Sequence, residues 1–365
     1  MKVFFLSLLL STVCSKHTNC IDTRLFHNIY GQTQNDYNND TEYDTINIPI
    51  VWHIIYYNDD QNIADNQLES QIRVLNKDFN LQNTDRFNTP GQWQDLMASF
   101  NLNFYTDKII RKHTNKYEWN VETQYNEMKF NKYSGSDAID THNKLNIWVV
   151  NFATLQSGYT LLGYAQFPTD FINHRNTDGV VLDYKATGTH GYLYIAHSLG
   201  RTATHEIGHW LNLKHIWGEP IDSKNYTDGC LFDDKVDDTP ISQYPHFQNI
   251  GYPNTESCGS SDMFMNHMDY GNDSTGVMFT KGQMLRSRSI FEKDNVRYGF
   301  VKNGYKPPNN DYDDTWYIIF GVLTIFSVFF LTILIFRSLI KCLILKYQLR
   351  EMNRIEEVSP EELLT

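Results

Sequence analysis

One short segment limits the folds open to this chain more than any other: THEIGHWLNLKH, residues 204–215, which holds three histidines and a glutamate. His205 and His209 are four positions apart, so a helix would project both imidazoles from one face, about one turn from each other. His215 comes six positions later and can reach the same point only if the chain turns back at about Asn212. Asparagine is one of the few non-glycine residues that tolerate the left-handed backbone of such a turn. The segment therefore predicts a helix followed by a tight reversal.

This spacing of histidines suits a zinc-binding site. Neutral imidazole nitrogens are good zinc ligands, and a catalytic zinc typically keeps three protein ligands and an open position for water. Glu206 would lie beside such a metal without being needed as a ligand. The alternatives are a pair of surface or core histidines on an amphipathic helix, and a zinc site whose third ligand is a distant glutamate. His215 makes the distant glutamate unnecessary, and a chance match of this length is rare.

The composition suits a globular domain and argues against one class of partner. Hydrophobic residues make up 41% of the 365 residues, which is ample for a sizeable core. The formal net charge of -12, without a stripe of lysines and arginines, argues against a nucleic-acid partner. The oligomeric state is not indicated by the sequence.

The first residues are typical of a secretory signal peptide, predicted as residues 1–15. Lys2 is followed by the apolar run VFFLSLLL and then by small or polar residues. The alternative is a buried N-terminal strand or helix. Residues 16–45 are rich in Asn, Asp, Thr and Tyr without a sustained period, and we expect a polar leader or short propeptide there. Export would permit disulfide bonds further along the chain.

A second apolar run, residues 316–336, carries no charge, and as a helix it would span about 30 Å, the thickness of a bilayer core. It predicts a transmembrane helix, with a long buried core helix as the alternative. Acidic residues precede the run and basic residues follow it, so the positive-inside rule places the tail, residues 337–365, in the cytoplasm. Residues 304–315, rich in Pro, Asn and Asp, are predicted to form a stalk. The expected protein is a single-pass type I membrane protein with an extracellular or lumenal main domain.

Residues 46–303 are predicted to form that main domain. The stretch INIPIVWHIIYY, from Ile46, is β-branched and aromatic and indicates a buried strand. The stretch from Asn66 to Phe79 indicates a helix, because its apolar residues share one stripe: Leu68, Ile72, Leu75 and Phe79. Further strands are expected at Ser99 to Tyr105, Leu145 to Phe152 and Gly179 to Tyr184.

The histidine segment, together with other blocks of the chain, resembles the pappalysin family of metzincin zinc metalloproteases. The metzincin pattern is H-E-x-x-H-x-x-G-x-x-H, followed by a methionine-containing turn. The matching blocks cover most of residues 48–290 and include LNIWVVNFA, LLGYAQFP, DGVVLDY, HEIGHWLNLKHIWG, VDDTP and MFMNHMDYGNDSTGVMFTKGQ. The resemblance implies an α+β fold: a metzincin-like zincin catalytic domain with a twisted mixed sheet, an active-site helix and a Met-turn.

The resemblance also implies an activity, that of a zinc metalloendopeptidase acting on protein or peptide substrates. A zinc-activated water would attack the peptide bond, with the metal held by His205, His209 and His215. Glu206 would act as general base, and Tyr270 would steady the reacting carbonyl. The resemblance further implies that Met268 lies in the Met-turn beneath the metal. An extended substrate would pair with an edge strand near Gly179 to Tyr184.

The chain departs from the family pattern at several positions. Asn212 stands where the pattern has glycine. Cys230 and Cys258 match one of the two disulfides usual in the family, whereas Tyr252 and Thr275 occupy the positions of the other, which indicates a lost bridge. The resemblance suggests a structural calcium ion in the loop DDKVDDTP, although a solvated acidic loop is an alternative; its oxygen ligands would come from Asp234, Asp237 and Thr239.

Two features of the exported part stay open at this stage. Cys20 would be a lone thiol in the leader, and as a cysteine switch it could occupy the open zinc position until the leader is removed; it could also pair with a second chain. Three Asn-X-Ser/Thr triplets fit a glycoprotein, at Asn39, Asn225 and Asn272. The rival to the protease hypothesis is a membrane-anchored binding or adhesion protein with a structural zinc site. Glu206 counts against it, because a structural site needs no unliganded carboxylate.

Overall fold

The computed structural model describes residues 2–4, 43–218, 226–247, 255–302, 336–341, 343, 344, 346 and 350. The chain divides into two units, Met1–Pro307 and Pro308–Thr365, and the described residues of the second unit are helical. Within the described part of the chain, no helix is both long and apolar enough to cross a membrane. The predicted span, residues 316–336, lies outside the described residues except for Phe336. Most of the predicted signal peptide, leader, stalk and tail also lies outside them.

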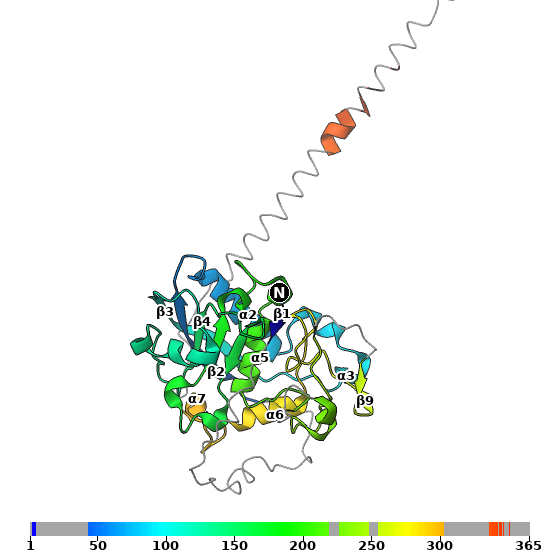
Figure 1. Cartoon of the computed structure of the whole chain (residues 1–365). Coiled ribbons are helices and arrows are strands. Elements are labelled where there is room, and N and C mark those ends of the chain that lie inside the picture. Colours follow the sequence, from blue (N-terminus) through cyan, green and yellow to red (C-terminus); the bar gives the residue numbers. More distant parts are fainter. Residues whose placement is uncertain are drawn as a thin grey trace, which may run out of the picture. The chain divides into compact units, whose positions relative to one another are not determined.

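A five-stranded sheet forms the centre of the first unit (Figure 1). Its strands, in spatial order, are β3 (Leu102–His113), β2 (Ile46–Tyr56), β4 (Leu145–Val150), β7 (Val180–Asp183) and β6 (Gly163–Ala165). The first four strands run parallel to their neighbours, and β6 runs antiparallel to β7. The predicted mixed sheet is therefore confirmed.

The strands pair where the β-branched and aromatic runs predict them, although β4 ends two residues before Phe152 and β7 is one residue shorter at each end than expected. Side chains of β4 and β7 are buried on both faces, as is usual for strands inside a largely parallel sheet. β3 begins three residues after the expected Ser99 and continues to His113. Its second half is partly exposed and carries charged side chains, so the sequence run is too polar to predict a strand on apolar content alone.

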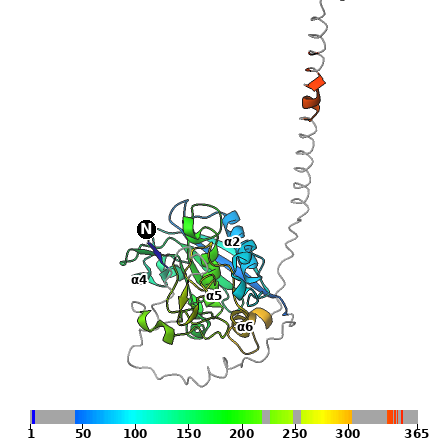
Figure 2. The ribbon, with the colours of Figure 1, turned by 90° about the vertical axis from the view of Figure 1, so that its right-hand side faces the viewer.

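Helices cover one face of the sheet. α2 (Asp65–Phe79) and α5 (Arg201–Trp210) pack side by side, as Figure 2 shows. Leu68, Leu75 and Phe79 of α2 enter the same core as Ile207 of α5, which confirms the predicted apolar stripe. The other face of the sheet packs on a second core that includes Val121 of α4 (Val121–Gln124). The sheet is thus buried between two apolar layers.

The remaining elements are short, apart from α6. The helices are α3 (Gly91–Gln94), α6 (Lys281–Ser289) and α7 (Gly299–Lys302). The strands are β1 (Lys2–Phe4), which pairs in parallel with β5 (Tyr159–Leu161), and the hairpin of β8 (Glu256–Ser257) and β9 (Ser260–Ser261). Short 3-10 helices are η1 (Thr84–Asn88), η2 (Glu127–Lys129), η3 (Asn131–Tyr133), η4 (Pro168–Asp170), η5 (Arg175–Thr177), η6 (Tyr184–Ala186), η7 (Ile195–His197) and η8 (Tyr226–Leu231).

The edge of the sheet differs from the prediction. The expected edge strand near Gly179 to Tyr184 is β7, but β7 lies between β4 and β6 and has a hydrogen-bonded neighbour on each side. The strand at that edge of the described sheet is β6. Three residues beginning with a glycine are too short to give a period-two signal, so β6 was not predicted.

Candidate active site

The active-site segment consists of α5 and the reversal that follows it. His205, Glu206 and His209 lie on α5, and the helix ends at Trp210. Asn212 then adopts a left-handed backbone with φ 76°. The N–H of Leu213 donates to the carbonyl of Gly208 at 2.9 Å, which closes the end of the helix in the usual way for a left-handed cap. The predicted turn at Asn212 is confirmed.

The reversal brings three imidazoles to one point. The Nε2 atoms of His205, His209 and His215 lie 3.1–3.3 Å from one another. All three residues are buried, and within the described ranges this is the group of side chains able to share a metal ion. The three residues predicted as ligands are therefore neighbours in space.

These nitrogens fit a zinc ion. Zinc–nitrogen bonds of about 2.0–2.1 Å at tetrahedral angles separate ligand nitrogens by about 3.4 Å, close to the spacing seen here. Nδ1 of His205 faces the carbonyl of His267, and Nδ1 of His209 faces that of Leu213, both at 2.7 Å. Because carbonyls only accept, each Nδ1 carries the proton and each Nε2 presents a lone pair. Burial lowers the pKa of His205 to about 3, so the ring is neutral, as a ligand must be.

Glu206 lies beside this cluster and is fully buried. Neither carboxylate oxygen has a hydrogen-bond partner among the described residues. Burial raises the pKa of Glu206 well above its ordinary value, because the charged form is poorly solvated there. A Cβ atom at Gly163 would lie 2.8 Å from Cγ of Glu206, so the edge strand β6 passes directly over this side chain.

Aromatic rings enclose His215. The ring of Trp217 stacks on it with centroids 4.3 Å apart, and the ring of Tyr270 meets it edge-on at 4.8 Å. Trp217 and Tyr270 contact each other at 4.7 Å, and both are buried. Tyr270 is therefore placed next to the ligand cluster. Trp217 was not predicted, because an apolar residue after a motif carries no signal of its own.

Met268 lies in the turn beneath α5. Its side chain is fully buried, and a Cβ atom at Gly208 would lie 2.4 Å from its sulfur. His267, one residue earlier, provides the carbonyl that orients His205. The turn thus contacts the helix at the level of the three histidines.

Comparison with known proteins decides the family. The family model described as pregnancy-associated plasma protein-A matches residues 129–292. An extracellular metalloprotease of Arthroderma benhamiae is 30% identical over 261 residues, covering 68% of this chain and 73% of that protein. The chain belongs to the pappalysin family. It is a metalloendopeptidase.

Further relatives agree with this assignment. Extracellular metalloprotease 1 of Coccidioides posadasii is 30% identical over 246 residues, which cover 63% of this chain and 70% of that protein. Mature mirolysin of Tannerella forsythia, solved with a cleaved peptide, is 38% identical with a TM-score of 0.67, covering 73% of this chain and 100% of that one. Promirolysin of the same organism is 37% identical with a TM-score of 0.66, covering 73% and 88%. The pappalysin domain shares the mixed α/β fold of mirolysin.

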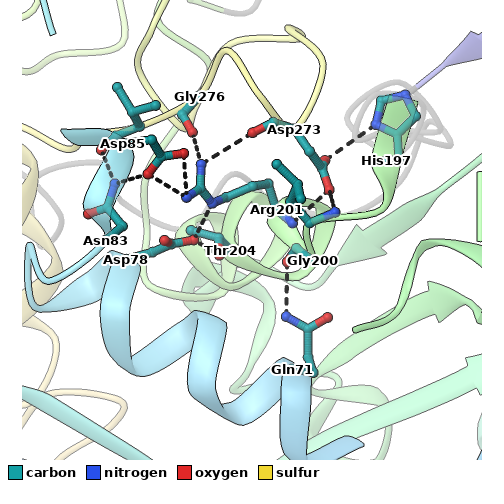
Figure 3. Close-up of polar contacts among 12 residues, drawn as sticks. Gln71, Asp78, Asn83, Asp85, His197, Gly200, Arg201, Thr204, Asp273 and Gly276 are labelled. Carbon is teal, nitrogen blue, oxygen red and sulfur yellow. Dashed lines mark hydrogen bonds and ion pairs between the residues drawn. The ribbon is translucent and has the colours of Figure 1, made fainter. Parts of the chain in front are cut away.

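A network around Arg201 holds the start of the pappalysin active-site helix (Figure 3). The guanidinium of Arg201 contacts Asp78 of α2 at 2.8 Å and Asp85 at 3.0 Å. Asp78 also accepts a hydrogen bond from Thr204, the residue before His205, at 2.8 Å. The carboxylate of Asp273, just beyond the Met-turn, accepts the backbone N–H of Arg201 at 3.2 Å. No sequence pattern predicts this network, since its members are far apart along the chain.

Of the three predicted calcium ligands, Asp234 and Thr239 contact each other. Asp234 is buried and accepts hydrogen bonds from the hydroxyl of Thr239 at 2.8 and 2.9 Å and from the N–H of Val236 at 3.0 Å. Asp237 is exposed. The carbonyls of this loop accept from Arg286 of α6, which also donates to the carbonyl of Asn212 at 2.7 Å. The described contacts tie the loop to the ligand-bearing turn, and the calcium site stays a prediction.

The cysteines and glycosylation triplets divide between described and undescribed parts. Cys230 and Cys258 form a disulfide, the pair that the resemblance implies. Cys20, Tyr252, Asn39 and Asn225 lie outside the described residues. Asn272 is described and half-buried, next to the Met-turn.

Proposed function

We propose that this metalloendopeptidase is zinc-dependent and uses Glu206 as its general base. The observation that carries the proposal is the combination of three converging imidazoles with a buried carboxylate that has no hydrogen-bond partner among the described residues. A closed structural zinc site has no use for such a carboxylate. The substrates are proteins or peptides.

His205, His209 and His215 would hold the metal, each through Nε2. Zinc, when bound, supplies Lewis acidity that polarises water and the peptide carbonyl. The carbonyls of His267 and Leu213 hold the first two rings in the tautomer that leaves Nε2 unprotonated. The left-handed turn at Asn212 brings the third ring to them.

Glu206 moves the protons of the reaction. Its carboxylate takes a proton from the attacking water and returns it to the amine that leaves. Burial excludes competing solvent from the carboxylate, and no described side chain holds its oxygens in another hydrogen bond. The group is therefore available for both transfers.

Tyr270 stabilises charge on the substrate. Its phenol donates a hydrogen bond to the carbonyl oxygen as negative charge develops there. The contacts of its ring with the rings of His215 and Trp217 support this role. The hydroxyl acts on the transition state more than on the bound substrate, so it raises kcat rather than affinity.

The substrate would bind in extended form along β6, the edge strand. An unpaired strand edge offers backbone N–H and C=O groups to a peptide, which gives affinity without sequence preference. β6 passes over Glu206, and Phe167, two residues beyond it, packs on the ring of His209 at 5.1 Å. A peptide along β6 would therefore run past the ligand cluster. Mature mirolysin, a relative solved with a cleaved peptide, supports a peptide substrate.

We place the catalytic domain, residues 46–303, outside the cytoplasm. Residues 1–15 would direct export, residues 316–336 would anchor the protein as a single-pass type I membrane protein, and residues 337–365 would be its cytoplasmic tail. The relatives in Arthroderma benhamiae and Coccidioides posadasii are named extracellular metalloproteases, which supports the extracellular or lumenal position.

Metal removal tests the proposal. Full-length protein in detergent is assayed on a fluorogenic peptide before and after treatment with a chelator, and again after addition of one equivalent of zinc. Activity should fall with the metal and return with zinc. His215→Ala should lose zinc in dialysis while His190→Ala, at an exposed histidine, keeps it. Hydrolysis that survives complete removal of the metal would exclude a zinc peptidase.

A further inference from the structure

A second buried cluster of titratable groups adjoins Tyr270 and is separate from the three ligand histidines. It consists of His246, Asp262 and Asp269. Nδ1 of His246 lies 2.7 Å from Oδ2 of Asp269, and Nε2 lies 3.2 Å from Oδ2 of Asp262. The imidazole is thus held between two carboxylates, with little contact with solvent.

The chemistry of the partners sets the charge of His246. Ionised carboxylates only accept hydrogen bonds, so the ring satisfies both by donating from both nitrogens, which only the imidazolium does. Burial lowers the pKa of His246, but the hydrogen bonds to Asp262 and Asp269 and the charges of these residues outweigh burial and raise the pKa to about 9. His246 is a cation at neutral pH.

Asp269 connects this cation to Tyr270. Its Oδ1 accepts the backbone N–H of Tyr270 at 2.7 Å and that of His246 at 2.8 Å. Its Oδ2 accepts a hydrogen bond from Nδ1 of His246. With both oxygens engaged the carboxylate is not free to rotate, so the backbone of Tyr270 is fixed through it.

The cluster is anchored at its far side. Oδ1 of Asp262 accepts a hydrogen bond from the hydroxyl of Ser257, the residue before the disulfide-bonded Cys258. Phe247, next to His246, packs its ring on that of Tyr270 at 5.8 Å. The segment that carries His246 therefore reaches Tyr270 in two ways: through Asp269 to its backbone, and through Phe247 to its ring.

We propose that His246 is a positioning residue for Tyr270, acting through Asp269. The imidazolium fixes the Asp269 carboxylate, and the carboxylate fixes the backbone of Tyr270 beside the ligand cluster. The inference rests on the role of Tyr270 proposed above. Loss of the contact should lower kcat, because a displaced phenol no longer meets the developing charge, and should leave KM nearly unchanged, because β6 is not touched.

Two substitutions at His246 separate this role from a general structural one. In His246→Asn the amide nitrogen takes the place of Nδ1 and still donates to Asp269; in His246→Gln it takes the place of Nε2 and faces Asp262 instead. Both variants remove the ring and the charge. We expect kcat to fall on the order of tenfold or more in His246→Gln, with KM within about twofold, and His246→Asn to restore kcat to within about threefold of the full-length wild type.

The test is completed by making His246→Asn and His246→Gln also in the Tyr270→Phe variant. Tyr270→Phe alone should reduce kcat on the order of a hundredfold, and in that background the two His246 variants should have equal kcat. Wild-type kcat in Tyr270→Phe would refute the role of Tyr270 and the positioning proposal with it. A slow Tyr270→Phe enzyme in which His246→Gln still falls below His246→Asn would overturn the positioning proposal alone. Equal kcat for the pair in the wild-type background would also overturn it.

Separate control measurements show whether each variant folds. Zinc content and thermal unfolding are measured for every variant, with the exposed His190→Gln as the matched histidine substitution. If His246→Gln yields no folded protein, Asp269→Asn and Asp269→Ala replace the pair. The asparagine oxygen still accepts the N–H of Tyr270, so kcat should be higher in Asp269→Asn than in Asp269→Ala. Equal values would contradict the proposal.

Discussion

The sulfur of Met268 lies so close to the backbone of Gly208 that a Cβ atom at Gly208 would be 2.4 Å from it. Gly208 lies on α5 between Glu206 and His209. Met268 belongs to the same turn as His267, whose carbonyl orients the ring of His205. The turn and the helix are therefore in direct contact at the level of the three histidines. This contact explains why a glycine occupies a helix interior, where it usually costs stability.

We predict that Gly208→Ala destabilises the protein. In an ordinary helix this change would stabilise by about 1 kcal/mol, but here the added methyl overlaps a fully buried side chain, and overpacking costs about 1–3 kcal/mol. Thermal unfolding should show a lower Tm than wild type. In a Met268→Ala background the cost of Gly208→Ala should shrink, because the sulfur is gone. A Tm equal to or above that of wild type in the single variant would show that the contact is not tight.

A second prediction concerns Asn212, which holds φ 76° at the reversal between His209 and His215. Asn212→Gly should keep the turn and zinc binding, because glycine adopts this backbone without a penalty. Asn212→Val should cost about 1–2 kcal/mol or more and weaken zinc retention, because a β-branched residue resists φ above zero. Zinc competition with a chelator measures the difference. Equal retention in the two variants would mean that the reversal does not depend on this backbone.

The convergence of the three histidines could be predicted from sequence because its geometry is local. His205, His209 and His215 lie within one helix and one turn, so spacing alone brings them together, and the tolerance of asparagine for a left-handed backbone accounts for the reversal. α2 was predicted for a similar reason, since its apolar stripe has a helical period.

The features that were not predicted depend on contacts between segments that are distant along the chain. β6 has three residues and no period, so the edge of the sheet was placed one strand too far inward. The Arg201 network joins α2, α5 and the loop at Asp273, and no spacing in the sequence relates them. His246 is a single histidine in a loop, and only the fold reveals that two carboxylates flank it.

A third prediction follows from the raised pKa of His246. The folded pKa of about 9 lies above the ordinary value of 6.5, so protonation of His246 stabilises the fold. This contribution, about 3 kcal/mol, is fully present below pH 6.5 and is lost as pH rises through 9. The Tm of wild type relative to His246→Asn should therefore decline between pH 6.5 and 9.5. A difference in Tm between the two proteins that stays constant over this range would contradict titration of His246 near pH 9.

A fourth prediction concerns the disulfide between Cys230 and Cys258, which closes a loop with a sequence separation of 28. The Cys230→Ser/Cys258→Ser double variant should lose about 3–4 kcal/mol of unfolding free energy, because the unfolded chain regains the freedom that the link removes. Peptide mapping without reduction should recover the linked pair from full-length wild-type protein solubilised in detergent. Two free thiols in that material would contradict the pairing, and a Tm unchanged by the double substitution would contradict the stabilisation.

The central claim, that Glu206 is the general base beside a zinc held by three histidines, is tested most directly by measuring zinc content and peptide hydrolysis together in Glu206→Gln. Glutamine has nearly the same shape as glutamate but takes up no proton, and Glu206 is not needed as a ligand. The variant should retain about one zinc per chain, as in wild type, while kcat falls on the order of a hundredfold or more. Full zinc occupancy with wild-type hydrolysis in Glu206→Gln would contradict the account.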